Sequence, residues 1–313
     1  MAHAITYDRF GGPDVLSLTE IPDPVPDAGE VAIAVEAAGV NPIDIKLRTG
    51  ARASAPLDGP RGVGFDGAGV ISGVGEDVSG FAIGDPVVFF GVPGAYATTV
   101  VAPAAHVQAR PAAVSAAEGA AIGIPVGTAY QVLRSLRVRS GDTLLLHAGS
   151  GAVGQAAIQL AVLWGARVVA TASPRRFARV EELGATPVAY GDGLLGRLRE
   201  ASPDGYSVAL DGAGTDEALD TSRALVADHD RVATIVQGAR AAELGIRAFS
   251  GGSPQPLTEI EQTWRREAVP VALALLAAGR FSIEIAASVP LAAADDAQRL
   301  VESGADGKVV LTP

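Results

Sequence analysis

Residues 143–154 read TLLLHAGSGAVG, a glycine-rich turn that separates an apolar run from an amphipathic run. The run before the turn, residues 143–147, is typical of a short buried strand. The run after it, residues 152–164, is typical of a helix with alanine, isoleucine and leucine on its packed side. A strand, a glycine turn and a helix in this order predict the first βα unit of a dinucleotide-binding domain.

The three glycines of this turn form the pattern G-x-G-x-x-G, and each has its own expected role. The first permits the tight turn, the second lets the backbone approach a pyrophosphate, and the third allows the helix to pack closely on the strand. The N–H groups that open the helix then face an anion, and the helix dipole adds to the attraction. The alternative is a glycine-rich turn that binds nothing. The predicted cofactor-binding residues of the turn are Gly149, Ser150, Gly151, Ala152, Val153 and Gly154.

The residues after the next expected strand, 167–171, indicate which dinucleotide is bound. An NAD site usually places Asp or Glu there to bind the ribose hydroxyl. This chain has Ser173, Arg175 and Arg176 instead, and arginine pairs bidentately with phosphate oxygens. We therefore predict NADPH, with its 2′-phosphate held by these three residues. The alternative is that both arginines cap the next helix or face solvent.

The amino-acid composition limits the class of protein to which the chain can belong. The chain has 313 residues, 48% of them hydrophobic and 19% charged, which is ordinary for a soluble globular enzyme of one or two domains. The net charge is −11 and the basic residues are scattered, which argues against a nucleic-acid partner. No apolar stretch reaches the ~18 residues of a membrane span, and no signal peptide is visible, so we expect a cytoplasmic protein. With no cysteine, and four histidines without metal-ligand spacing, we expect no metal site.

The rhythm of the chain changes near residue 121. Before it, short alternating runs broken by glycine and proline predict a compact β-rich unit. After it, helices and strands alternate, which predicts a doubly wound parallel sheet. Beyond residue 250 we expect a helix over 257–279 interrupted at Pro270, a strand over 281–287, a helix over 292–303 and a strand over 308–312. The predicted domains are 1–120 with the returning segment 255–313, and 121–254.

Several short motifs occur in an order that resembles the medium-chain dehydrogenase/reductase superfamily, specifically its zinc-free quinone oxidoreductase branch. The resemblance implies a GroES-like catalytic domain, a Rossmann cofactor domain inserted within it, an active site in the cleft between them, and a homodimer. The motifs are Phe10–Leu16 (FGGPDVL), Ala37–Asp44 (AAGVNPID), Gly64–Val70 (GFDGAGV), Gly84–Val87 (GDPV), Gly127–Tyr130 (GTAY), the glycine turn, Glu182–Ala185 (ELGA) and Gly307–Leu311 (GKVVL).

Departures from the family pattern narrow the resemblance. Zinc-dependent relatives carry a cysteine near Val40 and a His-Glu pair at the place of Phe65 and Asp66, and this chain has neither. Quinone reductases of this branch often carry tyrosines where this chain has Lys46 and Ala51. The Asp-x-Lys pattern is more similar to the alkenal and enone reductases.

The predicted catalytic residues are Asn41, Asp44 and Lys46. As hydride reaches an enone or quinone, negative charge grows on a carbonyl oxygen and must be met by donors placed in advance. We expect Lys46 to hold that oxygen and to donate a proton, and Asn41 to donate its amide to the oxygen or to the cofactor ribose. Asp44 would orient Lys46 or Arg48. The alternative is an ordinary solvated charge cluster.

Further cofactor contacts are implied by the resemblance or by position after a strand. Thr128 resembles a threonine near the nicotinamide, or is a helix N-terminal hydroxyl, and Tyr190 resembles a tyrosine beside the adenosine phosphate, or is a packing residue. Lys308 would reach a phosphate or cap the last strand. We expect His147 to be packed, and Asp66 and Asp85 to be turn residues. The residues expected to line the nicotinamide are Val236, Gln237, Phe249 and Ser250.

These observations favour an NADPH-dependent, metal-free oxidoreductase that acts on a quinone or an α,β-unsaturated carbonyl. One alternative is an enoyl reductase of the polyketide or fatty-acid type, although the acidic chain shows no basic patch for a carrier protein. Another is a non-catalytic NADPH-binding sensor or structural protein.

Overall fold

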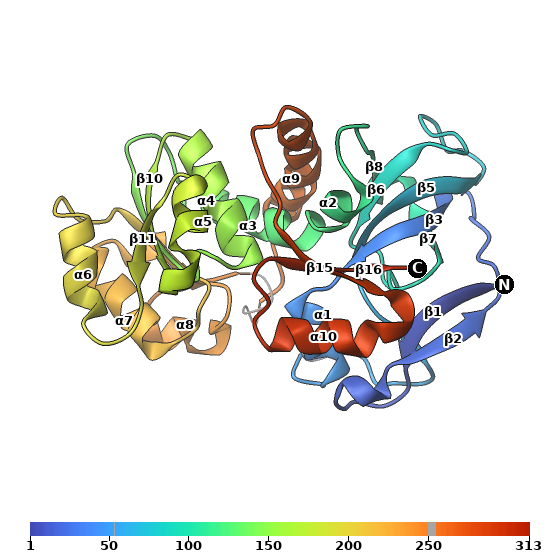
Figure 1. The fold of residues 1–313 in the computed structure, drawn as a ribbon, viewed down its shortest axis with the longest axis horizontal. Helices are drawn as coiled ribbons and strands as arrows, with labels where there is room; N and C mark the ends of the chain where they lie inside the picture. The colour runs from blue at the N-terminus through green and yellow to red at the C-terminus, as the bar shows by residue number, and fades with distance from the viewer. Residues whose placement is uncertain (53, 250–254) are drawn as a thin grey trace. The chain divides into compact units, whose positions relative to one another are not determined.

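The computed structural model describes residues 1–52, 54–249 and 255–313, and its sheets fall into two units (Figure 1). The first unit comprises residues 1–124 and 269–313, and the second comprises residues 125–268. The sequence-based boundaries were 120/121 and 254/255. The second boundary therefore lies later in the chain than expected, inside a long helix.

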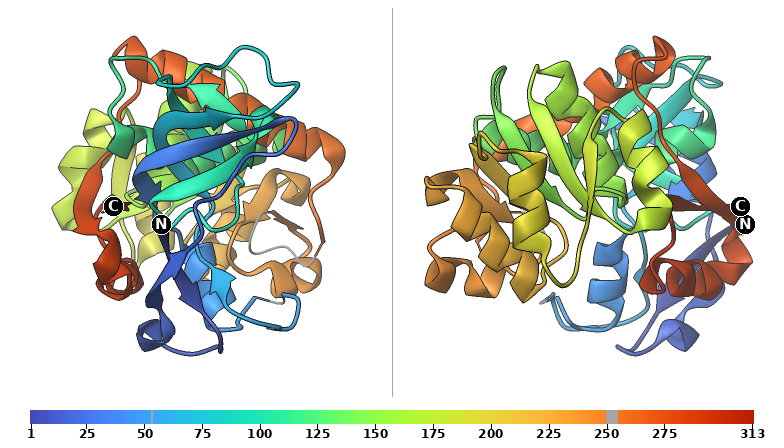
Figure 2. Two further views of the ribbon diagram at one scale, coloured as in Figure 1. Left: turned by 90° about the vertical axis from the view of Figure 1, so that its right-hand side faces the viewer. Right: turned by 60° about the vertical axis from the view of Figure 1, so that its left-hand side comes forward.

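The first unit is built on two sheets. One has the order β2-β1-β4, and the other has the order β15-β16-β3-β5-β6-β8, with β7 also paired to β3. The C-terminal strand β16 is antiparallel to β3, so the end of the chain returns to the sheet formed near its start (Figures 1 and 2). The strands are β1 (Ala2–Tyr7), β2 (Ser17–Ile21), β3 (Glu30–Gly39), β4 (Arg61–Gly62), β5 (Asp66–Val74), β6 (Pro86–Phe90), β7 (Thr99–Pro103), β8 (Val107–Ala109), β15 (Ile285–Pro290) and β16 (Lys308–Thr312).

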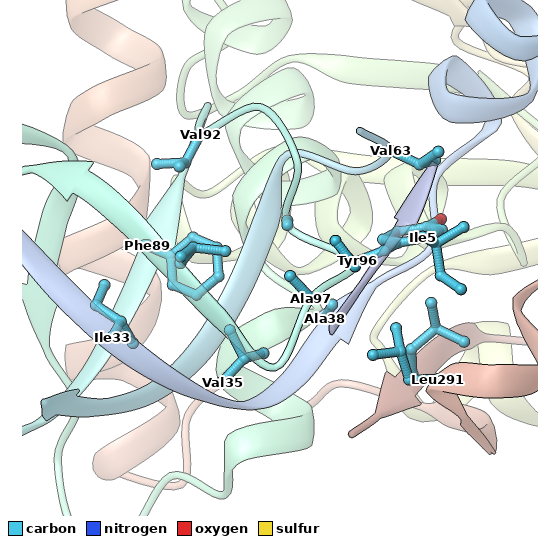
Figure 3. Packing of buried hydrophobic residues seen from close by; sticks show 14 of the residues in the cluster. Ile5, Ile33, Val35, Ala38, Val63, Phe89, Val92, Tyr96, Ala97 and Leu291 are labelled. Carbon is cyan, nitrogen blue, oxygen red and sulfur yellow. The ribbon is translucent and has the colours of Figure 1, made fainter. Parts of the chain in front are cut away.

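Alternating apolar residues on these strands form the core of the first unit. In β3, Ile33 and Val35 are buried while Ala34 and Glu36 are exposed, the alternation that a period of two produces; Ala32, where the register with β5 shifts, is also buried. Figure 3 shows Ile33 near Phe89 of β6, which has 0% exposure. Burial of one such phenylalanine stabilises the fold by about 1.5–3 kcal/mol. The helices of this unit are α1 (Pro42–Arg48), α2 (Ala116–Ala120) and α10 (Ala294–Glu302).

The second unit contains a six-stranded sheet in the order β11-β10-β9-β12-β13-β14, with every pair parallel. The chain steps from β9 outward to β11 and then returns to β12 on the other side of β9. The carboxyl end of β9 is therefore a topological switch point, where ligands bind in open α/β sheets. The strands are β9 (Thr143–His147), β10 (Arg167–Ala172), β11 (Thr186–Ala189), β12 (Val208–Asp211), β13 (Val232–Thr234) and β14 (Arg247–Ala248).

Helices connect these parallel strands and pack on the sheet, as Figure 2 shows for this unit. Crossover helices of this kind cover both faces of a parallel sheet, which is why its strands are largely apolar runs. The helices are α3 (Gly123–Ser135), α4 (Ala152–Leu163), α5 (Phe177–Glu182), α6 (Leu194–Ala201), α7 (Asp216–Leu225), α8 (Gly238–Leu244) and the first part of α9 (Glu259–Ala277).

The C-terminal quarter of the chain differs from the expectation at two points. The interruption predicted at Pro270 is wrong, because α9 continues through it. A proline costs about 3 kcal/mol inside a helix, but Ala268, Val269 and Ala272 are fully buried around it and their packing offsets that cost. The strand expected over 281–287 lies at Ile285–Pro290, where it pairs in parallel with β16.

Within the described residues, no helix combines the length and apolar character that crossing a bilayer requires.

Candidate functional site

The glycine turn follows β9 and opens α4, as the sequence predicted. The residue that adopts the left-handed conformation is Ala148, with φ of 61°. Its neighbour Gly149 donates its N–H to the Thr171 carbonyl of β10 over 2.9 Å. The tight turn that was assigned to the first glycine is therefore made at Ala148.

The glycines are required here for close packing. A Cβ on Gly149 would lie 2.6 Å from the Cβ of Ala170, and a Cβ on Gly154 would overlap the carbonyl oxygen of Ala148. Gly151, in contrast, is exposed, and the nearest atom to its Cβ would be 3.5 Å away. The first and third glycines thus bring α4 against the strands, and the second leaves open space.

The start of α4 can hold an anion. Gly151 is the N-cap residue and has no side chain to accept from the first amides of the helix. The N–H groups of Ala152, Val153 and Gly154 lie in the first turn, where a helix supplies no backbone acceptor and its dipole favours negative charge. Because these amides have no acceptor in the helix and Gly151 beside them is exposed, the arrangement fits a pyrophosphate group. Ser150 lies half-buried in the same turn.

A short basic segment follows β10. Ser173 precedes a single 3₁₀ turn, Pro174–Arg176, and is half-buried. Arg175 is exposed and Arg176 is half-buried. The carboxyl ends of β10 and β9 are neighbours because these strands pair in parallel register. The segment fits the phosphate of a phosphorylated ribose better than a hydroxyl, because no carboxylate is among its residues.

The remaining predicted cofactor residues of the second unit lie in different environments. Thr128 is in the interior of α3, not at its N-terminus, and its Oγ1 accepts from Arg265 Nη2 over 3.1 Å. Tyr190 follows β11 and is 61% exposed, which contradicts the packing alternative. Its ring is therefore accessible to a ligand.

Val236 and Gln237 follow β13 at the carboxyl edge of the sheet. Both donate their backbone N–H groups to Thr234 Oγ1, over 3.1 and 3.0 Å. Phe249 is buried, with the Arg247 guanidinium 4.7 Å above its ring centre. Ser250 lies outside the described residues. The loop after β13 is thus held at a sheet edge where ligands bind.

Asn41, the N-cap residue of α1 in the first unit, is at the centre of a buried polar cluster. Its Nδ2 group donates to the Gly39 carbonyl and to Asp66 Oδ2, both over 3.2 Å, and its Oδ1 accepts from Lys308 Nζ. Asn41 is 1% exposed. In this structure the amide group donates within the protein, which differs from the donation to substrate or ribose that we expected.

Asp44 belongs to the same cluster and does not orient Lys46 or Arg48. Its Oδ2 accepts from the backbone N–H of Asn41 and from the Tyr96 hydroxyl, each over 2.8 Å. Its Oδ1 has no hydrogen-bond partner among the described residues. Burial therefore raises the pKa of Asp44 to about 7, although these hydrogen bonds and the charge of Lys308 oppose the shift.

Asp66 is not the turn residue that the sequence suggested. It begins β5, is 1% exposed and accepts from the Ile124 N–H over 2.7 Å as well as from Asn41. Burial raises the pKa of this carboxyl, and the charge of Lys308 opposes the rise.

Lys308, the first residue of β16, supplies the positive charge of the cluster. Its ammonium donates to the Val40 carbonyl over 2.7 Å and to Asn41 Oδ1. It is 4% exposed, and burial lowers its pKa to about 8 against the pull of Asp66 and Asp44. This bonding differs from the phosphate contact that we expected for Lys308.

Lys46 and Arg48 do not form one solvated charge cluster with Asp44. Arg48 is fully buried and donates to Gln298 Oε1, the Gly11 carbonyl and Glu302 Oε1, so it joins α1 to α10. Lys46 is half-buried, and no ion pair involves it within the described residues. Of the three predicted catalytic residues, Asn41 and Asp44 belong to the buried cluster. Lys46 is the one whose side chain lies outside that cluster.

Sequence reasoning missed Tyr96 and misread Asp66. Tyr96 lies in the loop between β6 and β7, where no local pattern marks a functional residue. Asp66 offered a signal, since it is an acidic residue in the otherwise small and apolar stretch GFDGAGV. Within the described residues, no group of three or more His, Asp or Glu side chains is arranged to hold a metal ion.

The sequence also matches known proteins. Residues 27–112 match the alcohol dehydrogenase GroES-like domain, and residues 152–252 match the zinc-binding dehydrogenase domain. A mycobacterial quinone oxidoreductase of known structure is 30% identical, with complete coverage of both chains and a TM-score of 0.79. The chain belongs to the quinone oxidoreductase family of the medium-chain dehydrogenase/reductases. The predicted family and fold class are thereby confirmed.

Two further similar proteins bear on the function of the chain. The human (Homo sapiens) quinone oxidoreductase is 40% identical over 175 residues, which is 55% of this chain. The chain spans about half the length of the curated relatives that it matches, 53% for the human protein. A mycobacterial protein whose structure was solved in complex with NADPH is 29% identical to the present chain. The match covers both chains completely and has a TM-score of 0.83.

Proposed function

We propose that this protein is an NADPH-dependent oxidoreductase that reduces a quinone or an α,β-unsaturated carbonyl. The observation that carries the proposal is the uncapped start of α4 beside the Ser-Pro-Arg-Arg segment after β10. One element suits a pyrophosphate and the other suits a ribose phosphate. The relative solved with NADPH and the quinone oxidoreductases of the family support the same cofactor and reaction class.

The residues divide the work of binding. The amides of Ala152, Val153 and Gly154 would hold the pyrophosphate, and Ser173 with Arg175 and Arg176 would hold the 2′-phosphate. When bound, NADPH supplies a hydride to an electron-poor carbon. The exposed ring of Tyr190 and the loop of Val236 and Gln237 offer further contacts at the same edge of the sheet. Lys308 is not among these cofactor contacts, because its ammonium donates to Asn41 in the first unit.

Lys46 would meet the charge that develops on the acceptor oxygen. Its ammonium would stabilise the enolate or phenolate oxygen that forms when hydride arrives, and would then give that oxygen a proton. Protonation of the phenolate gives the hydroquinone, and protonation of the enolate gives an enol that tautomerises to the saturated carbonyl. Asn41 and Asp44 act indirectly in this scheme. Their cluster fixes the N-terminus of α1, the helix that carries Lys46.

The reaction is proposed to need no metal ion, because Val40 and Phe65 stand where zinc-dependent relatives carry ligands. Turnover should therefore be the same, within about twofold, before and after dialysis against EDTA or phenanthroline. A loss of activity that zinc restores would contradict this part of the proposal.

The experiment that tests the proposed function combines binding with turnover. NADPH and NADH are titrated calorimetrically, and NADPH oxidation is followed with 9,10-phenanthrenequinone and with 2-cyclohexenone. We expect NADPH to bind more tightly than NADH and at least one acceptor to be reduced. Tight NADPH binding without turnover of either acceptor would favour a non-catalytic sensor, and no binding would contradict the proposal altogether.

A further inference from the structure

A buried histidine lies directly beneath the glycine turn. His147 is the last residue of β9 and is 1% exposed. Its Nδ1 lies 3.2 Å from Thr171 Oγ1 on β10, and its Nε2 lies 3.4 Å from Thr221 Oγ1 on α7. Neither the binding of phosphate nor the proposed chemistry uses this side chain.

Thr171 connects that histidine to the turn itself. Its Oγ1 accepts from the N–H of Ala148 over 3.3 Å, and its carbonyl accepts from the N–H of Gly149 over 2.9 Å. Ala148 is the residue with a positive φ, a conformation that costs a residue with a Cβ about 1–2 kcal/mol. One threonine therefore holds both residues that begin the turn.

The hydrogen bonds around His147 have a definite direction. Thr221 Oγ1 donates its single hydrogen to a backbone carbonyl, that of Glu217 at 2.7 Å, and so it can only accept from His147 Nε2. Nδ1 must then be the acceptor, and Thr171 Oγ1 donates to it while accepting from Ala148. The pattern assigns a neutral imidazole with its proton on Nε2.

The surroundings favour that neutral form. Burial lowers the pKa of His147 to about 4, although the Asp211 carboxyl of β12 opposes the shift. Asp211 is itself engaged, since Oδ2 accepts from Thr234 Oγ1 and Oδ1 accepts from the N–H groups of Ala213 and Gly214. A protonated imidazole would leave the Thr171 hydroxyl hydrogen without its acceptor.

We propose that Thr171 and His147 are positioning residues for cofactor binding. The imidazole orients the Thr171 hydroxyl, which holds Ala148 left-handed and so keeps the glycine turn and the start of α4 in the conformation that accepts a pyrophosphate. This inference rests on the proposed function, because the ligand whose affinity it explains is NADPH.

The test compares two hydroxyls on opposite sides of the same imidazole. Thr171→Val removes the hydroxyl that reaches the turn, and Thr221→Val removes the one that does not. Thr171→Ser restores the hydroxyl without the methyl group. Kd for NADPH is measured by calorimetry at pH 7.5, and Tm is measured on the same samples.

We expect Thr171→Val to raise Kd about tenfold, in keeping with the loss of a buried hydrogen bond and one orphaned N–H. Thr171→Ser should stay within about twofold of the unsubstituted protein. Thr221→Val should lower Tm by a similar amount to Thr171→Val but leave Kd within about twofold. A purely structural role predicts that both valine variants change Kd equally or that neither does, and either result overturns the proposal.

A second pair of variants covers the case in which Thr171→Val does not fold. His147→Leu removes the acceptor for Thr171, whereas His147→Asn keeps an oxygen at the position of Nδ1. Kd should rise about tenfold in the first and less than about threefold in the second, and equal values would overturn the proposal. If the unsubstituted protein does not bind NADPH, the proposed function and this inference both fail; normal binding that Thr171→Val leaves unchanged overturns only the inference.

Discussion

Asn41 illustrates how burial decides what a single polar side chain can do. Its position within the motif AAGVNPID favours a donor to substrate, yet its amide group donates to Gly39 and Asp66 and its oxygen accepts from Lys308. An amide with every group engaged inside the protein has none left for a ligand. At the residue scale, the role of Asn41 is to join the buried carboxyl of Asp66 to the buried ammonium of Lys308, each of which also has a partner in the backbone.

Lys46 gives the first prediction at this scale. Lys46→Ala should lower kcat for an enone at least tenfold while Kd for NADPH stays within about twofold, because the ammonium acts on the acceptor and not on the cofactor. Lys46→Arg should recover part of the activity, since it keeps the charge. Steady-state kinetics and calorimetry on the same preparations check this, and full activity of the alanine variant would remove Lys46 from the mechanism.

Arg175 and Arg176 give the second prediction at the residue scale. The double variant Arg175→Ala/Arg176→Ala should weaken NADPH binding about 10- to 100-fold and NADH binding by less than about threefold, because charged hydrogen bonds to a phosphate are worth about 1.5–3 kcal/mol. Arg199→Ala, an exposed arginine on α6, is the control and should change neither affinity. Equal losses for both cofactors would contradict the assignment of the 2′-phosphate.

At the scale of elements, the close approach of α4 to β9 depends on one glycine. A Cβ on Gly154 would overlap the Ala148 carbonyl oxygen and lie 2.8 Å from the Cα of Gly149, and both are backbone atoms that cannot rotate away. Gly154→Ala should therefore destabilise the protein by about 1–3 kcal/mol and weaken NADPH binding as the helix start shifts. Urea unfolding and calorimetry measure the two effects.

The matched control for this prediction is Gly196→Ala in α6. A Cβ there meets nothing within 4 Å, so the same substitution should stabilise the protein by about 0.5–1 kcal/mol through better helix propensity. NADPH affinity should not change. If both alanine variants behave alike, helix propensity and not the approach of α4 explains the Gly154 result.

At the scale of the whole molecule, the two units should respond to pH in opposite directions. The pKa of Asp44 in the first unit is raised to about 7, so the folded state holds a proton that the unfolded chain has lost. Stability from this group is fully present below pH 4 and declines as pH rises to about 7. The pKa of His147 in the second unit is lowered to about 4, so stability from it declines as pH falls from 6.5 to 4.

Hydrogen exchange resolved by peptide, and corrected for the intrinsic pH dependence of exchange, measures both trends. Between pH 5 and pH 6.5, protection should fall with rising pH in strands of the first unit and increase in strands of the second. Asp44→Asn, which keeps an acceptor for Asn41 and Tyr96, should flatten the first trend alone. A decline of both units at the same end of this range would contradict the prediction.

The local sequence pattern was sufficient to predict structure wherever neighbours in sequence are also neighbours in space. The runs of β9 and β16 predicted the observed strand bounds, 143–147 and 308–312, because β9 is buried throughout and β16 is buried at all but its last residue. The order of strand, glycine turn and helix predicted the dinucleotide-binding domain, and the short motifs along the chain carried the resemblance to the family that the comparisons confirm. These features follow from backbone geometry and period, which a few consecutive residues specify.

Tertiary structure alone decided which polar groups remain available. The cluster of Asn41, Asp66 and Lys308 joins residues that are 25 and 267 positions apart, and the helix through Pro270 depends on apolar contacts on either side of it. The burial of a polar group and its hydrogen-bond partners depend on what surrounds the group after folding. The spacing of residues along the chain does not predict those surroundings. Sequence by itself therefore determined the scaffold and its family, while the packing of distant strands decided that Asn41, Asp44 and Lys308 hold one another.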